Sequence, residues 1–438
     1  MKTFLTDSVV VLFLRMAGIL VNLAIFVAIA NKLSTTDVGA FSLISTVAVI
    51  ARYLGPLGFD QVAIKIIPRY ILDNDTASIQ NLHASSLAFI IFSSAIVSAL
   101  SVFLYSHATE QFFHLGLYFI FIGVVTSCAI SGLCAGILRG HGRVFSAFLP
   151  DSFLSYLITA ICCVYLVYTE ELTLERSLVS AALGYACAAL LQLASLAKIS
   201  LKLPFPREYR APFRDAFSMW TVQAANLLQS RSAVYFAYVL GTATTAALMD
   251  TAARVALLPT LVTWAIGSIA APQLVKYSAQ NKRGEVQKLI LVSTWASFIP
   301  SVLTLVVYFA FGRLALSTFF PQEYLLSYWP TLICLGAMTI NASTSICSTY
   351  LIYSGKQAVV FAFTVISAAT FFISGFIISI YDVLIGISLS TLLSVAVRDF
   401  GIMLYLAQTE KLYSGVWDPR GISLLATLLK ERSQQWLP

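Results

Sequence analysis

Residues Trp220–Leu240, WTVQAANLLQSRSAVYFAYVL, combine a length suited to a membrane with side chains suited to ligand binding. A spanning helix needs roughly 20 mainly apolar residues, and this stretch places Arg231 near its middle, after Gln223 and Asn226. A guanidinium at that depth costs about 3 kcal/mol on insertion scales. Because lipid supplies no counter-charge, Arg231 needs a carboxylate, water or an anionic ligand.

Other arginines also fall inside predicted spans, and few acids lie at comparable depth. The cations are Arg15, Arg52, Arg231, Arg254 and Arg398, and the acids are Asp250 and Asp399. Asp250 and Arg254 are one turn apart in the order that favours an intrahelical ion pair. Arg398 can pair with Asp399, while Arg15 and Arg52 lie close enough to one predicted face to extend to headgroups. Arg231 has no acid in its own helix, so we predict that it faces an aqueous cavity.

Neutral polar residues align with several of these arginines at helical spacing. The aligned sets are Ser8, Arg15 and Asn22; Ser45 and Arg52; Gln223, Asn226 and Ser230; Asn341, Ser345 and Ser348; and Ser390, Ser394 and Arg398. The guanidinium fork matches phosphate oxygens, and amide and hydroxyl groups can bond sugar hydroxyls. A cavity with this lining suits an anionic ligand that carries many hydroxyls.

The elements that must position these residues are helices in a membrane. The 438 residues are 59% hydrophobic and 11% charged, whereas soluble domains carry roughly 25% charged residues. Hydropathy predicts an all-α polytopic membrane protein with twelve transmembrane helices. Their approximate ranges are 9–30, 38–58, 83–105, 115–137, 151–168, 176–198, 217–240, 245–271, 289–311, 329–351, 358–380 and 384–406.

Charge sets the expected orientation and the division of the chain. Most lysines and arginines outside the spans fall on one side, so the positive-inside rule places both termini in the cytoplasm. We expect an N-terminal bundle over 1–198, a basic cytoplasmic linker over 199–216, a C-terminal bundle over 217–406 and a cytoplasmic tail over 407–438. The first apolar run is too long for a signal peptide and is predicted to be a retained helix.

Two further segments have the pattern of helices that lie on the inner leaflet. Val62–Leu72 mixes apolar residues with two cations, and Arg420–Trp436 places leucines and one isoleucine on one side. A solvated helix is the alternative for the tail.

Several function classes are disfavoured by the sequence. No segment has the Walker A pattern of an ATP-hydrolysing protein. The seven cysteines form neither CxxC pairs nor metal spacings, and the four histidines are scattered. We therefore expect no metal, no cofactor, no nucleic-acid partner and no enzymatic activity.

Several motifs, spread over most of the chain, resemble those of a known family. The opening is FLRMAGILVNLAIFVAIANKLSTTDVGAFSLISTVAVIARYLGPLGFDQVAIKIIPRY, and later come GILRGHGR (Gly136–Arg143) and APQLVKYSAQNKRGEVQKL (Ala271–Leu289). These motifs resemble polysaccharide flippases of the O-antigen (Wzx) type, within the multidrug/oligosaccharidyl-lipid/polysaccharide exporter (MOP) superfamily. The resemblance implies two six-helix bundles around a central cavity in a bacterial inner membrane.

The resemblance also implies a function and a site. Such proteins move an undecaprenyl-pyrophosphate-linked oligosaccharide to the outer leaflet by alternating access, in contact with membrane lipids and alongside glycan polymerase and chain-length regulator proteins. Family members carry cationic cavity residues in the first, second, seventh and eighth helices. The predicted substrate-binding residues here are Arg15, Asn22, Arg52, Gln223, Asn226, Arg231 and Arg254, and Asp250 is the predicted ion-coupling residue.

Two alternatives remain open from the sequence. A cation-coupled drug or organic-cation antiporter of the same superfamily predicts an acidic cavity. A membrane-embedded glycan polymerase or transferase predicts catalytic acids or a sizeable outer loop, and the predicted outer loops are short.

Overall fold

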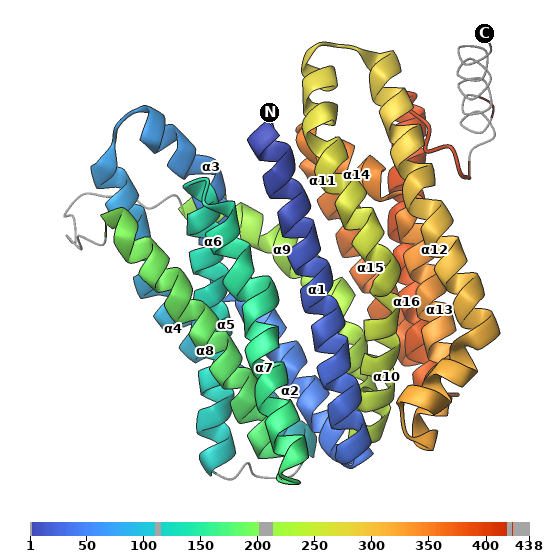
Figure 1. Cartoon of the computed structure of the whole chain (residues 1–438). Coiled ribbons are helices and arrows are strands. Elements are labelled where there is room, and N and C mark those ends of the chain that lie inside the picture. Colours follow the sequence, from blue (N-terminus) through green and yellow to red (C-terminus); the bar gives the residue numbers. More distant parts are fainter. Residues whose placement is uncertain (1, 110–114, 201–212, 418–422, 424–438) are drawn as a thin grey trace. The chain divides into compact units, whose positions relative to one another are not determined.

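The protein is all-α in a computed structural model, which describes residues 2–109, 115–200, 213–417 and 423. Contacts divide the chain into an N-terminal unit, Met1–Ala247, and a C-terminal unit, Leu248–Pro438. Figure 1 follows the helices along the chain.

The N-terminal unit is built around one central helix, α5, which contacts α2, α3, α4, α6 and α8. Its elements are α1 (Lys2–Lys32), α2 (Thr35–Leu54), α3 (Phe59–Leu72), α4 (Thr76–Thr109), α5 (Leu115–Gly140), α6 (Val144–Leu149), the π-helical turn η1 (Pro150–Leu154), α7 (Ser155–Tyr168), α8 (Leu174–Ser200), α9 (Phe213–Leu240) and the start of α10 (Ala243–Ala256).

In the C-terminal unit α16 packs against α13, α14 and α15, while α12 packs against α11 and α13. Beyond the rest of α10, its elements are α11 (Leu258–Ala279), α12 (Arg283–Phe319), the 3-10 turn η2 (Gln322–Ser327), α13 (Tyr328–Ala342), α14 (Ser345–Tyr353), α15 (Gln357–Ile378), α16 (Val383–Tyr405) and the π-helical turn η3 (Leu406–Glu410).

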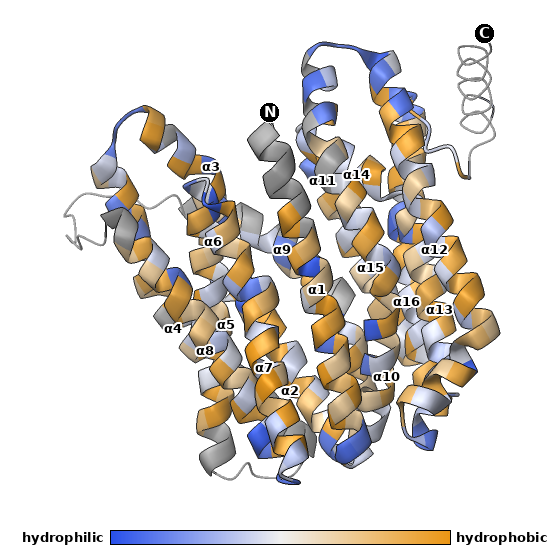
Figure 2. Ribbon diagram, in the orientation of Figure 1, coloured by the Kyte–Doolittle hydropathy of each residue, from blue (hydrophilic) through white to orange (hydrophobic). Residues whose placement is uncertain are grey.

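The prediction of a polytopic all-α protein is confirmed. Within the described residues, ten helices are long and apolar enough to cross a membrane, and the bent pair α10–α11 makes up to eleven. Figure 2 shows apolar residues along the helices and polar ones at the α3–α4 and α11–α12 connections. Side chains such as Leu303, Phe309 and Phe311 on α12 are more than half exposed, as expected where a helix meets lipid.

Each of the twelve predicted segments is largely helical, but three differ from the expected form. α9 is a 28-residue helix yet is absent from the apolar spans found among the described residues, because its amides and Arg231 lower its hydropathy. The predicted 245–271 helix bends by 41° between Ala256 and Leu258, just before Pro259. The predicted 329–351 helix is interrupted between Ala342 and Ser345.

The boundary between units also differs from the predicted linker at 199–216. α9 packs against α2 and α3 of the N-terminal unit, where Trp220 Nε1 donates to the Leu54 carbonyl over 3.0 Å. Residues 201–212 lie outside the described part of the chain. The division into two six-helix bundles stays a prediction.

The two predicted surface helices have different outcomes. Val62–Leu72 is helical within α3, but Val62, Ala63 and Ile67 are buried in a core cluster with α5 residues, so one face of it packs against protein. The Arg420–Trp436 segment lies outside the described residues apart from Ser423.

Candidate functional site

A buried ion pair in the N-terminal unit joins Arg52 of α2 to Asp151 of η1. Both guanidinium Nη atoms donate, one to each carboxylate oxygen, and Ser131 Oγ of α5 donates to Oδ1 over 3.1 Å. The Asp151 side chain is 1% exposed and that of Arg52 is 18% exposed. A buried charge is tolerated when it is paired and hydrogen-bonded. Asp151 therefore explains why Arg52 is stable within a span.

A π-helical turn positions Asp151. The Ser155 N–H donates to the Pro150 carbonyl, five residues earlier, which widens the helix at this point. α1 approaches the turn so closely that a Cβ at Gly18 would lie 1.7 Å from the Ser152 carbonyl oxygen. π-turns of this kind are frequent at functional sites. The Gly18 contact also fixes Arg15, one helical turn earlier on α1.

Glycines of α5 bring two charged residues to one helix face. A Cβ at Gly132 would lie 2.5 Å from the Arg52 carbonyl oxygen, and a Cβ at Gly136 would lie 2.5 Å from the Asp60 Cα. Small residues four apart allow backbones in membranes to approach closely. α5 thus places the end of α2 and the start of α3 in direct contact with its own surface.

Asp60 of α3 is a buried carboxylate that the sequence analysis did not assign. It is 4% exposed, and its Oδ2 accepts hydrogen bonds from Gln61 Nε2 at 2.8 Å and from Gln223 Nε2 at 3.3 Å. Its Oδ1 has no hydrogen-bond partner in the described structure. Gln223, predicted to bind substrate, is therefore engaged with Asp60.

Arg15 and Arg139 share an aromatic neighbour instead of a carboxylate. The guanidinium carbons of Arg15 and Arg139 lie 4.6 and 5.5 Å from the centre of the Phe148 ring. Such cation–π contacts contribute about 0.5–1 kcal/mol at exposed sites and more when desolvated. Neither arginine has an ion pair with a carboxylate among the described residues. Both are half-buried.

These residues form one electrostatic group. Arg15 interacts with Arg52 and Asp151, and Arg139 interacts with Asp60 and with the other three. We call Arg15, Arg52, Asp60, Arg139 and Asp151 the N-terminal charge cluster. With three cations and two carboxylates, the cluster carries a net positive formal charge.

The other residues of this unit that were predicted to bind substrate do not belong to the N-terminal charge cluster. Arg231 of α9 is half-buried, beside the buried Ser232 and Val234, and has no hydrogen bond or ion pair within the described residues of its unit. Asn22 of α1 bonds the Tyr156 hydroxyl. The side chain of Asn226 is outside the described part.

The first balanced pair of the C-terminal unit lies in α10. Arg254 Nε donates to Asp250 Oδ2 over 2.9 Å, which confirms the predicted intrahelical pair, and the pair directly precedes the α10–α11 bend. The Asp250 side chain is 2% exposed and that of Arg254 is 16% exposed.

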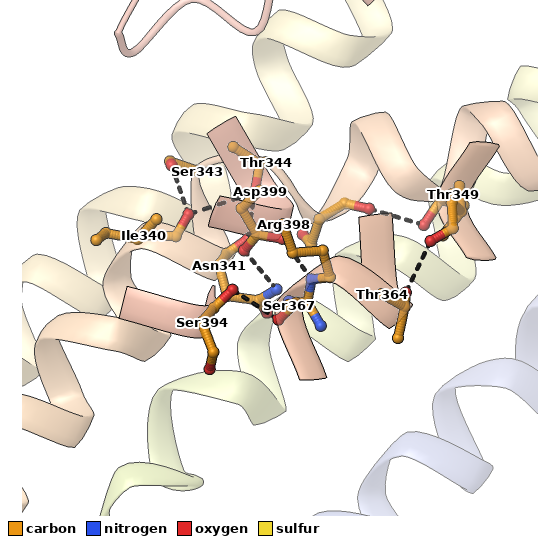
Figure 3. A network of polar contacts seen from close by, with 12 residues as sticks. Ile340, Asn341, Ser343, Thr344, Thr349, Thr364, Ser367, Ser394, Arg398 and Asp399 are labelled. Atoms are coloured by element: carbon orange, nitrogen blue, oxygen red, sulfur yellow. Dashed lines mark hydrogen bonds and ion pairs between the residues drawn. The ribbon is translucent and has the colours of Figure 1, made fainter. Parts of the chain in front are cut away.

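The second balanced pair lies in α16 and is drawn in Figure 3. Arg398 Nε donates to Asp399 Oδ1 over 2.7 Å, and Asn341 Nδ2 of α13 donates to Asp399 Oδ2 over 3.0 Å. Ser390 and Ser394 of the predicted polar row are fully buried and bond backbone carbonyls of their own helix. The polar row that was predicted on α16 to line a cavity is therefore part of the packed core at Ser390 and Ser394.

Sequence reasoning missed Asp60, Asp151 and Arg139. Only Asp250 and Asp399 were predicted as acids at depth, so the structure holds more buried carboxylates than the sequence analysis predicted. Asp151 had been the first residue of a predicted span, and Asp60 had been in a segment predicted to lie outside the spans. Burial of both side chains shows that helix ends contribute charges to the interior.

Metal ligation has little support in the described residues, where no group of three or more His, Cys, Asp or Glu side chains could hold a metal ion. His83 and His141 lie close, with 3.2 Å between their Nε2 atoms, but a third ligand does not join them.

Comparisons with known proteins identify the fold. No protein-family model and no curated protein matches the sequence. Among solved structures, the inward-facing conformation of a multidrug resistance MATE family transporter of the MOP superfamily superposes with a TM-score of 0.74 at 14% identity, over 92% of this chain and 99% of that chain.

Two further structures agree. A MOP superfamily transporter from Pyrococcus furiosus, described as having a binding pocket of reverse polarity that suggests a different function, gives a TM-score of 0.66 at 14% identity over 92% of this chain and 96% of its own. The structure of a MATE in complex with MaD3S gives a TM-score of 0.66 at 12% identity, over 94% of this chain and 97% of that chain. The chain therefore has the fold of these transporters, as the resemblance predicted.

Proposed function

We propose that this protein is a bacterial inner-membrane flippase that moves an undecaprenyl-pyrophosphate-linked oligosaccharide from the inner to the outer leaflet by alternating access. The observation that carries the proposal is the state of the arginines in the N-terminal unit. Arg15, Arg139 and Arg231 are half-buried and lack a carboxylate ion pair within the described residues of that unit. A diphosphate is the kind of anion that such guanidinium groups bind.

The fold supports the transport part of the proposal, since the neighbouring structures are described as transporters. The sequence resemblance supports the glycan part. We propose that Arg15, Arg231 and Arg254 contact the diphosphate during the cycle, with Arg254 released from Asp250 for part of it. Asn22, Gln223 and Asn226 are proposed contacts for sugar hydroxyls, and Arg52 acts through its pair with Asp151. Proposed partners are the lipid-linked glycan, the surrounding lipids, and polymerase and chain-length regulator proteins.

The test uses Arg231. Replacement by alanine is expected to abolish surface glycan without removing the protein from the membrane, and lysine is expected to rescue only partly because it lacks the planar fork. Arg176→Ala is the matched control, because Arg176 pairs with Glu171 at an exposed site. Normal surface glycan in the Arg231→Ala strain, with equal protein in the membrane, would refute the role of Arg231.

A drug or organic-cation antiporter is the second candidate, favoured by the buried carboxylate of Asp60 in the same unit. This candidate predicts that proteoliposomes accumulate a lipophilic cation against its gradient. The flippase predicts that a deletion strain accumulates lipid-linked glycan on the inner leaflet. Asp250 remains a proposed coupling residue, and a transport rate that ignores both proton and sodium gradients would exclude that role.

A further inference from the structure

Two buried oxygen atoms on neighbouring side chains lack hydrogen-bond donors. Asp60 Oδ1 and Gln223 Oε1 are both enclosed and have no partner in the described structure. Their side chains already touch, since Gln223 Nε2 lies 3.3 Å from Asp60 Oδ2. Leaving a buried acceptor unsatisfied costs about 1–3 kcal/mol, and more for a charged group. Two such acceptors on side chains that touch call for a donor or a cation.

We infer that Asp60 is a proton-binding site whose acid hydrogen bond to Gln223 links α3 to α9. Proton binding at Asp60 does not depend on the proposed function, whereas the coupling of that proton to transport rests on it. A proton that binds Oδ1 turns this oxygen into a donor, and the unpartnered amide oxygen of Gln223 is the kind of acceptor it needs. One proton from solvent thereby satisfies both atoms, and no other bond changes.

The charged surroundings of Asp60 are defined by the helices that pack on α3. α5 brings Arg139, which acts on Asp60 electrostatically but does not form an ion pair with it among the described salt bridges. α9 brings the neutral Gln223, and Gln61 donates from α3 itself. α4 also packs on α3, but its His83 interacts with His141 and not with Asp60 in the described structure. Arg139 and Asp60 partly balance each other's charge, so protonation of Asp60 leaves Arg139 with less compensation.

This arrangement gives protonation a mechanical and an electrostatic consequence. Gln223 lies two helical turns before Arg231 on α9, so a change at Asp60 reaches the helix that carries the isolated guanidinium. Protonation also neutralises the Asp60 carboxylate and so raises the net positive charge of the N-terminal charge cluster. Asp250 differs, since its carboxylate is already paired with Arg254.

The first experiment measures protonation directly and needs no transport. Full-length protein in lipid nanodiscs is titrated with acid while infrared difference spectra record the carbonyl band of buried carboxylic acids. We expect an acid-dependent band that disappears in Asp60→Asn and shifts in Gln223→Leu, because the acid loses its acceptor. Asp73→Asn, at an exposed position, is the control and keeps the band. An unchanged band in Asp60→Asn overturns the inference.

A second titration, with sodium in place of acid, distinguishes a proton site from a sodium site. If NaCl at alkaline pH shifts the carboxylate bands in an Asp60-dependent way while acid produces no new band, the site holds sodium and the proton assignment is wrong. Size-exclusion profiles identify variants that fail to fold. If Asp60→Asn fails to fold, Asp60→Glu takes its place; this variant keeps a carboxylic acid, so its carbonyl band should remain but change position.

The second experiment asks what the proton drives. In proteoliposomes, a cycle that moves one proton per substrate is expected to change the leaflet ratio of lipid-linked glycan about tenfold for each pH unit imposed. Asp60→Asn should remove this response while flipping down the glycan gradient continues. A wild-type protein that flips no glycan refutes the proposed function but leaves the infrared result standing. Loss of the pH response in Asp250→Asn but not in Asp60→Asn overturns the coupling role of Asp60.

Discussion

The two units neutralise their intramembrane arginines in different ways. In the C-terminal unit Arg254 and Arg398 each have a carboxylate within their own helix, at 2.9 and 2.7 Å. In the N-terminal unit Arg52 takes its carboxylate from a distant part of the chain, and Arg15 and Arg139 rest on an aromatic ring. Local pairs stabilise a helix whatever surrounds it, whereas long-range pairs depend on tertiary contact. The N-terminal unit thus retains arginines that no carboxylate of its described residues pairs, and the proposed function assigns them to an anionic ligand.

The largest expected effect is a loss of stability when the long-range Arg52–Asp151 pair is broken. Asp151→Asn leaves the Arg52 guanidinium without a counter-charge, and breaking a buried pair from one side typically costs 3–5 kcal/mol. Reversible unfolding in mixed detergent micelles should show a loss of about that size. Arg176→Gln, which breaks an exposed pair, should change stability by about 1 kcal/mol or less. Equal stability of the Asp151→Asn protein and the wild type would contradict this account of Arg52.

A smaller effect is expected for the local pair in α16. Asp399→Asn removes charge-assisted bonds to Arg398 and Asn341, and hydrogen bonds to charged groups contribute about 1.5–3 kcal/mol. We expect a loss near the lower end, because a polar amide remains at the site. The same unfolding assay measures it, and surface glycan per folded molecule, which reports on the proposed function, should stay constant. A selective loss of export would show that the C-terminal unit also presents a functional charge.

A third effect concerns how the C-terminal unit holds the segment that follows η3. Trp417 Nε1 donates to Ser343 Oγ over 2.7 Å at the interruption between α13 and α14. Trp417→Phe keeps an aromatic ring between Phe298 and Phe400 but loses the donor, for about 1 kcal/mol. Trp264→Phe, at an exposed ring, is the control. Equal unfolding midpoints for the two variants would exclude a stabilising bond at Trp417.

The smallest effect is a pH dependence in the N-terminal unit. Burial and the nearby Arg143 charge lower the pKa of His141 in the folded protein, so the unfolded chain binds more protons once the pH falls below about 6.5. Stability should therefore fall with acidification, over the range from that value down to the folded pKa of His141. His141→Gln should flatten the slope measured by unfolding between pH 7 and pH 5. An identical slope in the variant would assign the pH dependence to other groups.

Hydropathy sufficed to find most of the helices because they carry long apolar runs, and local spacing sufficed to pair Asp250 with Arg254. The Arg52–Asp151 pair was beyond such reasoning, since the two residues are 99 positions apart and meet only through the packing of α1, α5 and η1. Asp60 was missed for a related reason. It lies at a helix start after a tight turn, where Leu57 and Gly58 have positive φ angles, so its burial depends on tertiary contact with α5.

The glycine contacts of α5 have a consequence for how this protein can change. Any side chain added at Gly132 or Gly136 would collide with backbone near Arg52 or Asp60, so those sites should tolerate almost no substitution in a saturation library. Lipid-facing positions of α12 such as Leu303 or Phe311 are exposed and should accept most apolar residues. Substitutions that change the charges of the N-terminal unit would then arise on neighbouring helices, while the α5 backbone stays constant.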